Sequence, residues 1–261
     1  MKEKLSRNSK FKYYLSLLWE MVLKSYKVQY KKMYLGFGWF FLYPVMQMLV
    51  ASVVISVFLK VSMTDYFLSL YIGLVFWNAF NYTVQTSTLC YIKNRNLIKK
   101  TVFPKSVIPL SICVANIIQI SLPITILLGI SIVNKYFIFS NLFILFIVYF
   151  LFLILIFAIS LIVSILNVRF RDLYFIVQGG LQILFYISPV LYQTNLVPNN
   201  WMVLFYLNPL TSIIELTRSV IIGSAMPANN LMLVNLFVIL LLLNIGYFLF
   251  RKNKDLLDDW L

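Results

Sequence analysis

Long apolar segments constrain this chain more than any other feature of its sequence. Residues 37–59 and 141–166 are two examples, and the mean hydropathy of the whole chain is +0.90. The hydrocarbon core of a bilayer is about 30 Å thick and needs roughly 20 helical residues to cross it, so such runs indicate membrane spans. Because lipid cannot satisfy backbone hydrogen bonds, we predict an all-α integral membrane protein.

The apolar runs predict six membrane spans. Their approximate ranges are 37–59, 66–89, 106–133, 141–166, 173–189 and 231–250. The fourth range is almost purely apolar, and we expect it to be the most exposed to lipid. The apolar segment 201–223 contains Asn208-Pro209 and a charged pair, Glu215 and Arg218, which can neutralise each other at i, i+3. We therefore predict a re-entrant helix pair there, entering from outside, before the last span.

The distribution of positive charge predicts the orientation. With the N-terminus inside, nineteen of the 22 Lys and Arg residues fall in the cytoplasmic segments of the six-span topology. Cytoplasmic loops of membrane proteins collect Lys and Arg, so the net charge of +14 indicates membrane topology rather than a nucleic-acid partner. Both termini are expected in the cytoplasm. The expected divisions are an N-terminal region 1–36, a transmembrane domain 37–250 and a tail 251–261.

An amphipathic helix is predicted before the first span, over 10–32. Its polar stripe contains Lys12, Ser16, Glu20, Lys24, Lys27 and Lys31, and its apolar side contains Phe11, Tyr14, Leu15, Leu18, Val22 and Tyr26. A basic amphipathic helix with a Trp is typical of a helix lying flat in the cytoplasmic interface. The alternative is a soluble helix that packs on a partner.

A basic segment, 91–109, separates the second and third spans. It contains Lys93, Arg95, Lys99 and Lys100 within eight residues, and a charge at the bilayer centre costs roughly 2.5–3.5 kcal/mol or more. The segment must therefore lie in water or among headgroups. Helical spacing continues until Phe103-Pro104, so we predict a short cytoplasmic helix on which another protein acts. An ordinary positive-inside loop is the alternative.

The second span has a polar stripe. Asn78, Asn81 or Tyr82, Gln85 and Thr88 follow helical spacing. Amide side chains in lipid need partners, so this stripe should face other helices or a water-filled path.

The sequence lacks the residues that several kinds of catalysis and binding require. The chain has no His, which removes the usual general base and imidazole metal ligand, and only eight Asp and Glu residues. Cys90 and Cys113 lie in or beside apolar runs and do not indicate a disulfide framework. No G-x-x-x-x-G-K-[ST] motif occurs, so the chain has no phosphate-binding loop. We expect no metal and no cofactor on this chain, and any nucleotide-driven work must come from another subunit.

At several points the residues resemble a known family, the membrane-spanning permeases of ABC-type polysaccharide exporters for O-antigen, teichoic acid or capsule chains. The similar stretches cover most of the chain. They are Tyr30-Lys31-Lys32-Met33-Tyr34-Leu35-Gly36-Phe37-Gly38-Trp39 with Pro44, Gly73-Leu74-Val75-Phe76-Trp77-Asn78, Asn96-Leu97-Ile98-Lys99-Lys100 with Phe103-Pro104, Leu166-Asn167-Val168-Arg169-Phe170-Arg171-Asp172, Ser188-Pro189-Val190, and Asn208-Pro209-Leu210 with Glu215 and Arg218. Their order and spacing are specific to the family, not to one polysaccharide.

The resemblance implies a permease homodimer in the bacterial cytoplasmic (inner) membrane. Two separate ATPase subunits, which carry ATP and Mg, would dock below it, and a glycan on undecaprenyl diphosphate would cross between the two copies. The expected ATPase-coupling residues are Asn96, Leu97, Ile98, Lys99, Lys100, Phe103 and Pro104, with Leu97 and Ile98 entering the ATPase. Arg169, Arg171 and Asp172 would bind lipid phosphate or close the inner mouth, and Asn208, Pro209, Glu215 and Arg218 would form an outer gate.

Aromatic rings can stack on sugar faces and guide a glycan. The expected channel-lining residues lie beside Pro44 or on the polar stripes: Tyr43, Trp77, Asn78, Asn81, Tyr82, Gln85, Gln178, Gln182, Phe185 and Tyr186. For the Arg169–Asp172 turn and the Glu215–Arg218 pair, a structural ion pair is the alternative. Two other functions also stay open, an ABC permease for drugs or small lipids and a membrane glycosyl- or acyltransferase.

Overall fold

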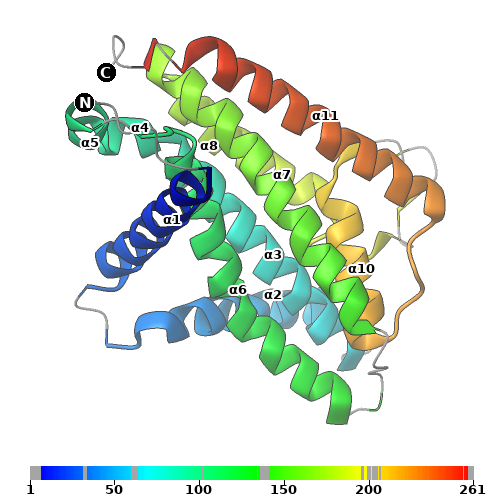
Figure 1. Ribbon diagram of the computed structural model, residues 1–261. Helices are drawn as coiled ribbons and strands as arrows, with labels where there is room; N and C mark the ends of the chain where they lie inside the picture. Colours follow the sequence, from blue (N-terminus) through cyan, green and yellow to red (C-terminus); the bar gives the residue numbers. More distant parts are fainter. Residues whose placement is uncertain are drawn as a thin grey trace.

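The chain folds into a bundle of α-helices (Figure 1). The computed structural model describes residues 7–31, 34–59, 64–101, 103–133, 135, 141–194, 197–198, 201, 205, 207–254 and 256–257. Its helices are α1 (Arg7–Tyr30), η1 (Gly36–Gly38), α2 (Trp39–Leu59), α3 (Thr64–Thr88), α4 (Cys90–Lys93), α5 (Arg95–Lys100), α6 (Val107–Val133), α7 (Asn141–Arg169), α8 (Leu173–Ile187), α10 (Leu210–Ile222) and α11 (Asn229–Asn253). No strand occurs within these described ranges, which confirms the all-α class.

Five of the described helices are long and apolar enough to cross a membrane. Their candidate spans are Gly36–Val54 (η1 and α2), Tyr66–Thr88, Val107–Val133, Asn141–Arg169 and Asn229–Asn253, and these match five of the six predicted spans. The fifth predicted span is α8, which is apolar but has only 15 residues. It ends where predicted, because Ser188 precedes Pro189 and adopts an extended conformation with ψ 147°. Six complete spans are therefore not confirmed.

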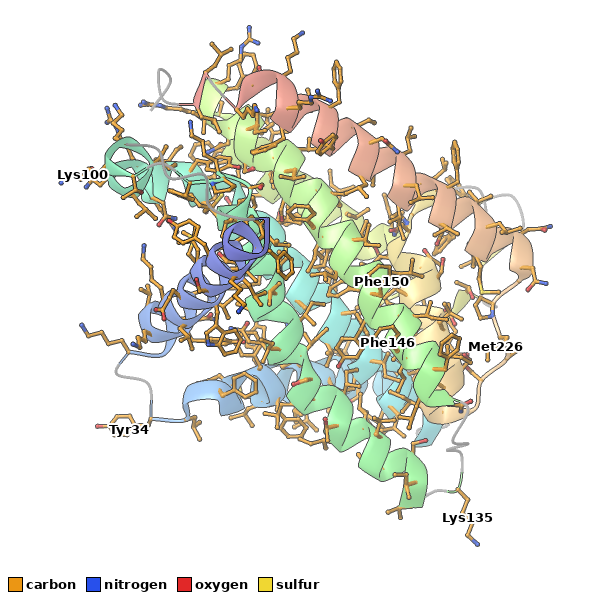
Figure 2. All side chains as sticks on the ribbon, in the orientation of Figure 1. Tyr34, Lys100, Lys135, Phe146, Phe150 and Met226 are labelled. Atoms are coloured by element: carbon orange, nitrogen blue, oxygen red, sulfur yellow. The ribbon has the colours of Figure 1, made fainter. Side chains whose placement is uncertain are left out.

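The fourth predicted span, α7, lies at the centre of the bundle (Figure 1) and packs against α3, α6, α10 and α11. In the apolar stretch of α7, 33% of the residues are buried. The corresponding share is 17% in α11 and 11% in α2. The expectation that this span is the most exposed to lipid was therefore wrong, and α2 and α11 are more exposed. Phe146 and Phe150 do point outward from the N-terminal half of α7 (Figure 2).

Two ends of the bundle differ in charge. α5, the C-terminal end of α7 and the C-terminal end of α11 gather at one end, whereas the N-terminal ends of α3 and α7 lie at the other (Figure 1). Lys100 projects from the first end and Lys135 from the second (Figure 2). The first end, which we call the cationic end, carries Lys93, Arg95, Lys99, Lys100, Lys105, Arg169, Arg171, Arg251, Lys252 and Lys254. The loops predicted to be cytoplasmic thus share one end.

The helix expected at 10–32 is α1, which packs across α6 (Figure 1). Met21 and Val22 are buried, and the Tyr26 hydroxyl donates to the carbonyl of Ala115 at 2.7 Å. Burial raises the pKa of Tyr26 to about 12, so the phenol keeps the proton that it donates. Phe11, Leu15 and Trp19, spaced i, i+4 and i+8, stay exposed. The helix therefore has two apolar faces, of which one packs on the bundle.

Two close helix contacts depend on glycine. A Cβ on Gly246 of α11 would lie 2.8 Å from the carbonyl oxygen of Ala158 on α7, so the two helices approach closely there. Gly73 of α3 plays the same part beside the turn after α8, where a Cβ would lie 2.6 Å from the carbonyl oxygen of Val190. Small residues at such contacts are typical of helix packing in membranes.

Candidate functional site

The basic segment forms two short helices, α4 and α5, that meet at Asn94 (Figure 1). Arg95, Asn96, Lys99, Lys100 and Pro104 are exposed, whereas Leu97 and Phe103 are half-buried. Ile98 is only 4% exposed and belongs to an internal apolar cluster. The expectation that Ile98 projects into a partner is therefore wrong. Helical spacing alone did not show which side of this short segment packs inward.

This apolar cluster joins the basic segment to the rest of the protein. Its buried members are Met21, Cys90, Tyr91, Ile98, Val107, Ile108, Ile112, Ile165, Val168 and Leu257. They come from α1, α4, α5, α6, α7 and the C-terminal tail. Burial raises the pKa of the Cys90 thiol above its ordinary value, so the thiol stays protonated and unreactive. We call this group the lower cluster.

Asn94 links the basic segment to α1. Its Nδ2 donates to the carbonyl of Cys90 at 2.9 Å, and its Oδ1 accepts a hydrogen bond from Lys24 Nζ at 3.0 Å. The backbone at Asn94 leaves helical geometry, with φ −105° and ψ 20°. One side chain therefore ends α4 and ties the start of α5 to the N-terminal helix.

Arg169, Arg171 and Asp172 lie on the exposed turn between α7 and α8, at the cationic end. The guanidinium carbon of Arg169 lies 5.2 Å from the centre of the Phe170 ring, which is the geometry of a cation–π contact. Among the residues that the structure describes, no cation lies within ion-pair distance of Asp172. The turn thus contains two exposed cationic residues and one exposed carboxylate.

A cavity of about 700 Å³ opens between α1, α2, α3 and α6. It brings together five of the ten residues expected to line a channel, Tyr43, Asn78, Asn81, Tyr82 and Gln85. The remaining lining residues are Gln29, Tyr34, Leu35, Trp39, Phe40, Pro44, Val75, Ala79, Ile120 and Pro123. None of the described residues that line it is charged, so they offer aromatic faces and neutral amides.

The polar groups of this cavity hold one another in place. Gln85 Nε2 donates to Asn81 Oδ1 at 2.8 Å, and Asn78 Nδ2 donates to Gln47 Oε1 of α2 at 2.6 Å. The Tyr82 ring meets Phe40 edge-on, with ring centres 6.3 Å apart. Thr88, the last member of the polar stripe, is buried and bonds to its own helix at Val84. The stripe was predicted to face other helices or a water-filled path; Asn78 bonds to α2, and Asn78, Asn81, Tyr82 and Gln85 line the cavity.

The other five expected channel residues lie elsewhere. Trp77 is buried and packs against Phe185 of α8, with ring centres 5.3 Å apart. Gln178, Gln182 and Tyr186 form an exposed stripe along α8 at i, i+4 and i+8. Within a single copy of the chain, the α8 stripe and the cavity are separate surfaces.

Glu215 and Arg218 form a buried pair on α10. Arg218 Nη1 donates to Glu215 Oε1 at 2.9 Å. The guanidinium also donates to three carbonyls outside α10, at Ser69, Val190 and Tyr192. All thirteen residues of α10 are buried. The pair therefore fixes α10 to α3 and to the turn after α8. This agrees with the alternative given above, that Glu215 and Arg218 form a structural ion pair.

Asn208 and Pro209 begin α10. Asn208 Oδ1 accepts a hydrogen bond from the backbone N–H of Leu210 at 3.1 Å, and Asn208 Nδ2 donates to Ser188 Oγ at 2.8 Å. Pro209 precedes the first helical residue, where its missing N–H costs nothing. Residues 202–204 and 206, in the first half of the expected re-entrant pair, lie outside the described residues.

Sequence reasoning missed several amides. Gln29 of α1 accepts a hydrogen bond from Gln119 Nε2 of α6 at 3.0 Å, and Asn116 Nδ2 donates to the carbonyl of Ala79 at 3.0 Å. Asn116 and Gln119 are an i, i+3 pair of amides within an apolar span, the same signal that identified the stripe on α3. Among the described residues, no group of three or more His, Cys, Asp or Glu side chains could hold a metal ion.

The sequence is similar to proteins of known family. Residues 16–222 match the model of the family described as "ABC-2 type transporter". Two proteins of Klebsiella pneumoniae, both described as "O-antigen export system permease protein RfbA", are 29% identical over 250 residues and 30% identical over 257 residues. Each alignment covers 94% of this chain and 96% of the relative.

A Myxococcus xanthus protein with the same description is 26% identical over 216 residues, which cover 82% of this chain and 83% of that protein. The family match extends from α1 to the end of α10 and includes the basic segment, the cavity and the buried pair. The chain therefore belongs to the family of ABC-2 type transporters.

Proposed function

We propose that this chain is the permease subunit of an ATP-driven exporter of lipid-linked polysaccharide. The observation that carries the proposal is its similarity, over 94% of its length, to permeases described as parts of O-antigen export systems. The uncharged cavity of aromatic and amide side chains supports it, because rings can stack on sugar faces while amides bond to hydroxyl groups.

ATP hydrolysis is assigned to a separate ATPase subunit that carries ATP and Mg. The chain has no phosphate-binding loop, and the basic segment offers an exposed surface at the cationic end. Arg95, Asn96, Lys99 and Lys100 form the contact, while Leu97 and Ile98 join it to the lower cluster. A push on α5 would then reach α1, α6 and α7 through side chains that are already packed.

The permease acts as a homodimer. α8 exposes Gln178, Gly179, Gly180 and Gln182, and amides are unfavourable against lipid. α2 exposes an apolar stripe of Trp39, Tyr43, Met46, Val50 and Val53. A second copy that covers α8 and lies beside α2 would bury the amides and enclose a path for a glycan. The α8 stripe and the cavity would then line one path from two copies.

The lipid carrier of the glycan is an undecaprenyl diphosphate. Arg169 and Arg171 at the cationic end have the right charge for its diphosphate, whereas the described residues that line the cavity are neutral. α1 lies in the cytoplasmic interface, with Phe11, Leu15 and Trp19 among the lipid headgroups. The cationic end faces the cytoplasm of a bacterial cell, by the positive-inside rule, with both termini on that side.

α10 and the turn after α8 form a fixed outer element rather than a moving gate. Arg218 makes hydrogen bonds to the carbonyls of three residues outside α10, and a gate that moved α10 would have to break them. α10 spans about 20 Å at 1.5 Å per residue, less than a bilayer, so it enters the membrane from outside without crossing it.

The experiment that tests this function is deletion of the permease in its own bacterium. Lipid-linked glycan should accumulate on the cytoplasmic leaflet, and the tagged permease should co-purify with an ATPase. Accumulation of a drug or of a lipid without sugar would favour the permease for small molecules instead. Glycan transfer by the purified chain without any ATPase would favour a transferase.

A further inference from the structure

The C-terminal tail reaches back into the lower cluster. Leu257 has no exposed surface. Residues beyond a helix end are well ordered only where contacts tie them down. Lys105 Nζ supplies one tie, because it donates to the carbonyl of Lys254 at 3.1 Å. Residues of the tail therefore contact the chain just after α5.

The basic segment cannot fix its own position. α5 has six residues and α4 has four, whereas isolated helices shorter than about 12–15 residues are marginal in water. Neither helix has a side-chain hydrogen bond at its N-cap. Their placement must come from the Lys24–Asn94 hydrogen bond and from packing in the lower cluster.

We propose that the tail residues Lys254 and Leu257 are positioning residues that brace α5 against the ATPase. Leu257 closes the lower cluster, to which Ile98 and Val107 contribute from the two sides of the turn after α5. The Lys105–Lys254 hydrogen bond holds the tail on the same turn. With the brace in place, a push on α5 moves the bundle; without it, the push is absorbed by a local shift of α5. This inference rests on the proposed function.

The test compares Leu257→Ala with Leu256→Ala in the permease–ATPase complex. Leu256 is the adjacent residue and is 42% exposed, so its variant is a matched control. Hydrogen exchange of the 94–101 peptide, measured in lipid nanodiscs, reports the bracing without any transport. Glycan exported per ATP hydrolysed, measured in proteoliposomes, reports the coupling.

For Leu257→Ala we expect roughly tenfold faster exchange in 94–101, because truncating a buried Leu weakens local packing. Export per ATP should fall at least about fivefold, because α5 then shifts locally and no longer passes the movement of the ATPase to the bundle. Leu256→Ala should match the wild type, and Leu257→Met should restore both values. If the Leu257→Ala protein does not accumulate, Leu257→Val takes its place. That variant must also show faster exchange in 94–101 and lower export per ATP, by smaller factors.

Unchanged exchange in 94–101 would overturn the brace. Faster exchange with unchanged export per ATP would also overturn it, because a merely structural residue lowers the amount of protein and leaves that ratio alone. The wild-type complex separates this inference from the proposed function. If it hydrolyses ATP but exports no glycan, the function fails, whatever the variants do.

Discussion

Arg218 donates a 2.9 Å hydrogen bond to Glu215, one turn earlier on α10, and its guanidinium is almost completely buried. The same group donates to the carbonyls of Ser69, Val190 and Tyr192. Three segments far apart in the sequence, α3, the turn after α8 and α10, therefore meet at one side chain.

We predict that Arg218→Met destabilises the permease by about 3–5 kcal/mol, because it leaves a buried carboxylate without its cation. Adding Glu215→Gln should recover a large part of this loss, since no charge then remains unpaired. The measurement is thermal unfolding of purified protein in detergent. A double variant as unstable as Arg218→Met would show that the carbonyl contacts, not the ion pair, carry the stability.

Gly73→Leu tests the close approach beside this pair. A side chain at that position must displace the backbone at Val190, to which Arg218 also donates. We expect a loss of roughly 1–3 kcal/mol or more from overpacking, in the same unfolding assay. Gly129→Leu is the control, because a Cβ there has open space around it. Equal stability of the two variants would contradict the contact.

The cavity makes a prediction about export. Asn81→Leu or Gln85→Leu removes one partner of the 2.8 Å amide pair and one group available to a sugar hydroxyl. Glycan at the cell surface should fall roughly tenfold at unchanged protein level, the effect of about 1.4 kcal/mol in binding. Thr83→Val, a buried change on the core side of α3, is the matched control. Normal glycan amount and length in both cavity variants would remove the cavity from the path.

Charge reversal tests the contact with the ATPase. Lys99→Glu with Lys100→Glu changes two exposed residues of α5, whereas Ile98→Asp would bury a charge in the lower cluster and test folding instead. We expect at least roughly tenfold weaker co-purification of the ATPase, because charges across an interface set partner choice. Arg251→Glu with Lys252→Glu makes the same charge change on α11 at the same end. Equal weakening by both pairs would indicate general attraction, not a contact at α5.

The orientation can be tested by cysteine labelling of intact spheroplasts. Lys135→Cys should react with an impermeant maleimide from outside, and Lys100→Cys only after permeabilisation. The native thiols, Cys90 and Cys113, are buried and should give little background. Burial also raises the pKa of Cys90, which lowers its thiolate fraction further. Labelling of Lys100→Cys from outside would reverse the topology.

The sequence was sufficient to predict the elements that depend on a local pattern of residues. Apolar length predicted five helices that match the spans, and the spacing of Asn78, Tyr82 and Gln85 predicted the polar side of α3 that lines the cavity. Both ends of the fifth predicted span agree with α8, but a helix of 15 residues is not confirmed as a complete span. Hydropathy identified the apolar segment, but it did not show whether so short a helix crosses the bilayer.

Contacts between distant segments could not be predicted in the same way. α7 is apolar on every side, and such a helix suits lipid and a protein core equally, so composition could not place it at the centre. Ile98 and Leu257 are 159 positions apart and share the lower cluster. The cations around Ile98 indicated an exposed helix correctly, but its inward side depends on Met21 and Val107, which no local pattern connects to it.

The proposed exporter takes its energy from a subunit outside this chain, and one reconstitution tests that most directly. Permease, ATPase and fluorescent lipid-linked glycan are placed in proteoliposomes, and transfer across the bilayer is measured. We predict transfer only when the ATPase and hydrolysable ATP are both present, and none with a hydrolysis-deficient ATPase. Sustained transfer by the permease alone, at the rate of the complete complex, would contradict the account.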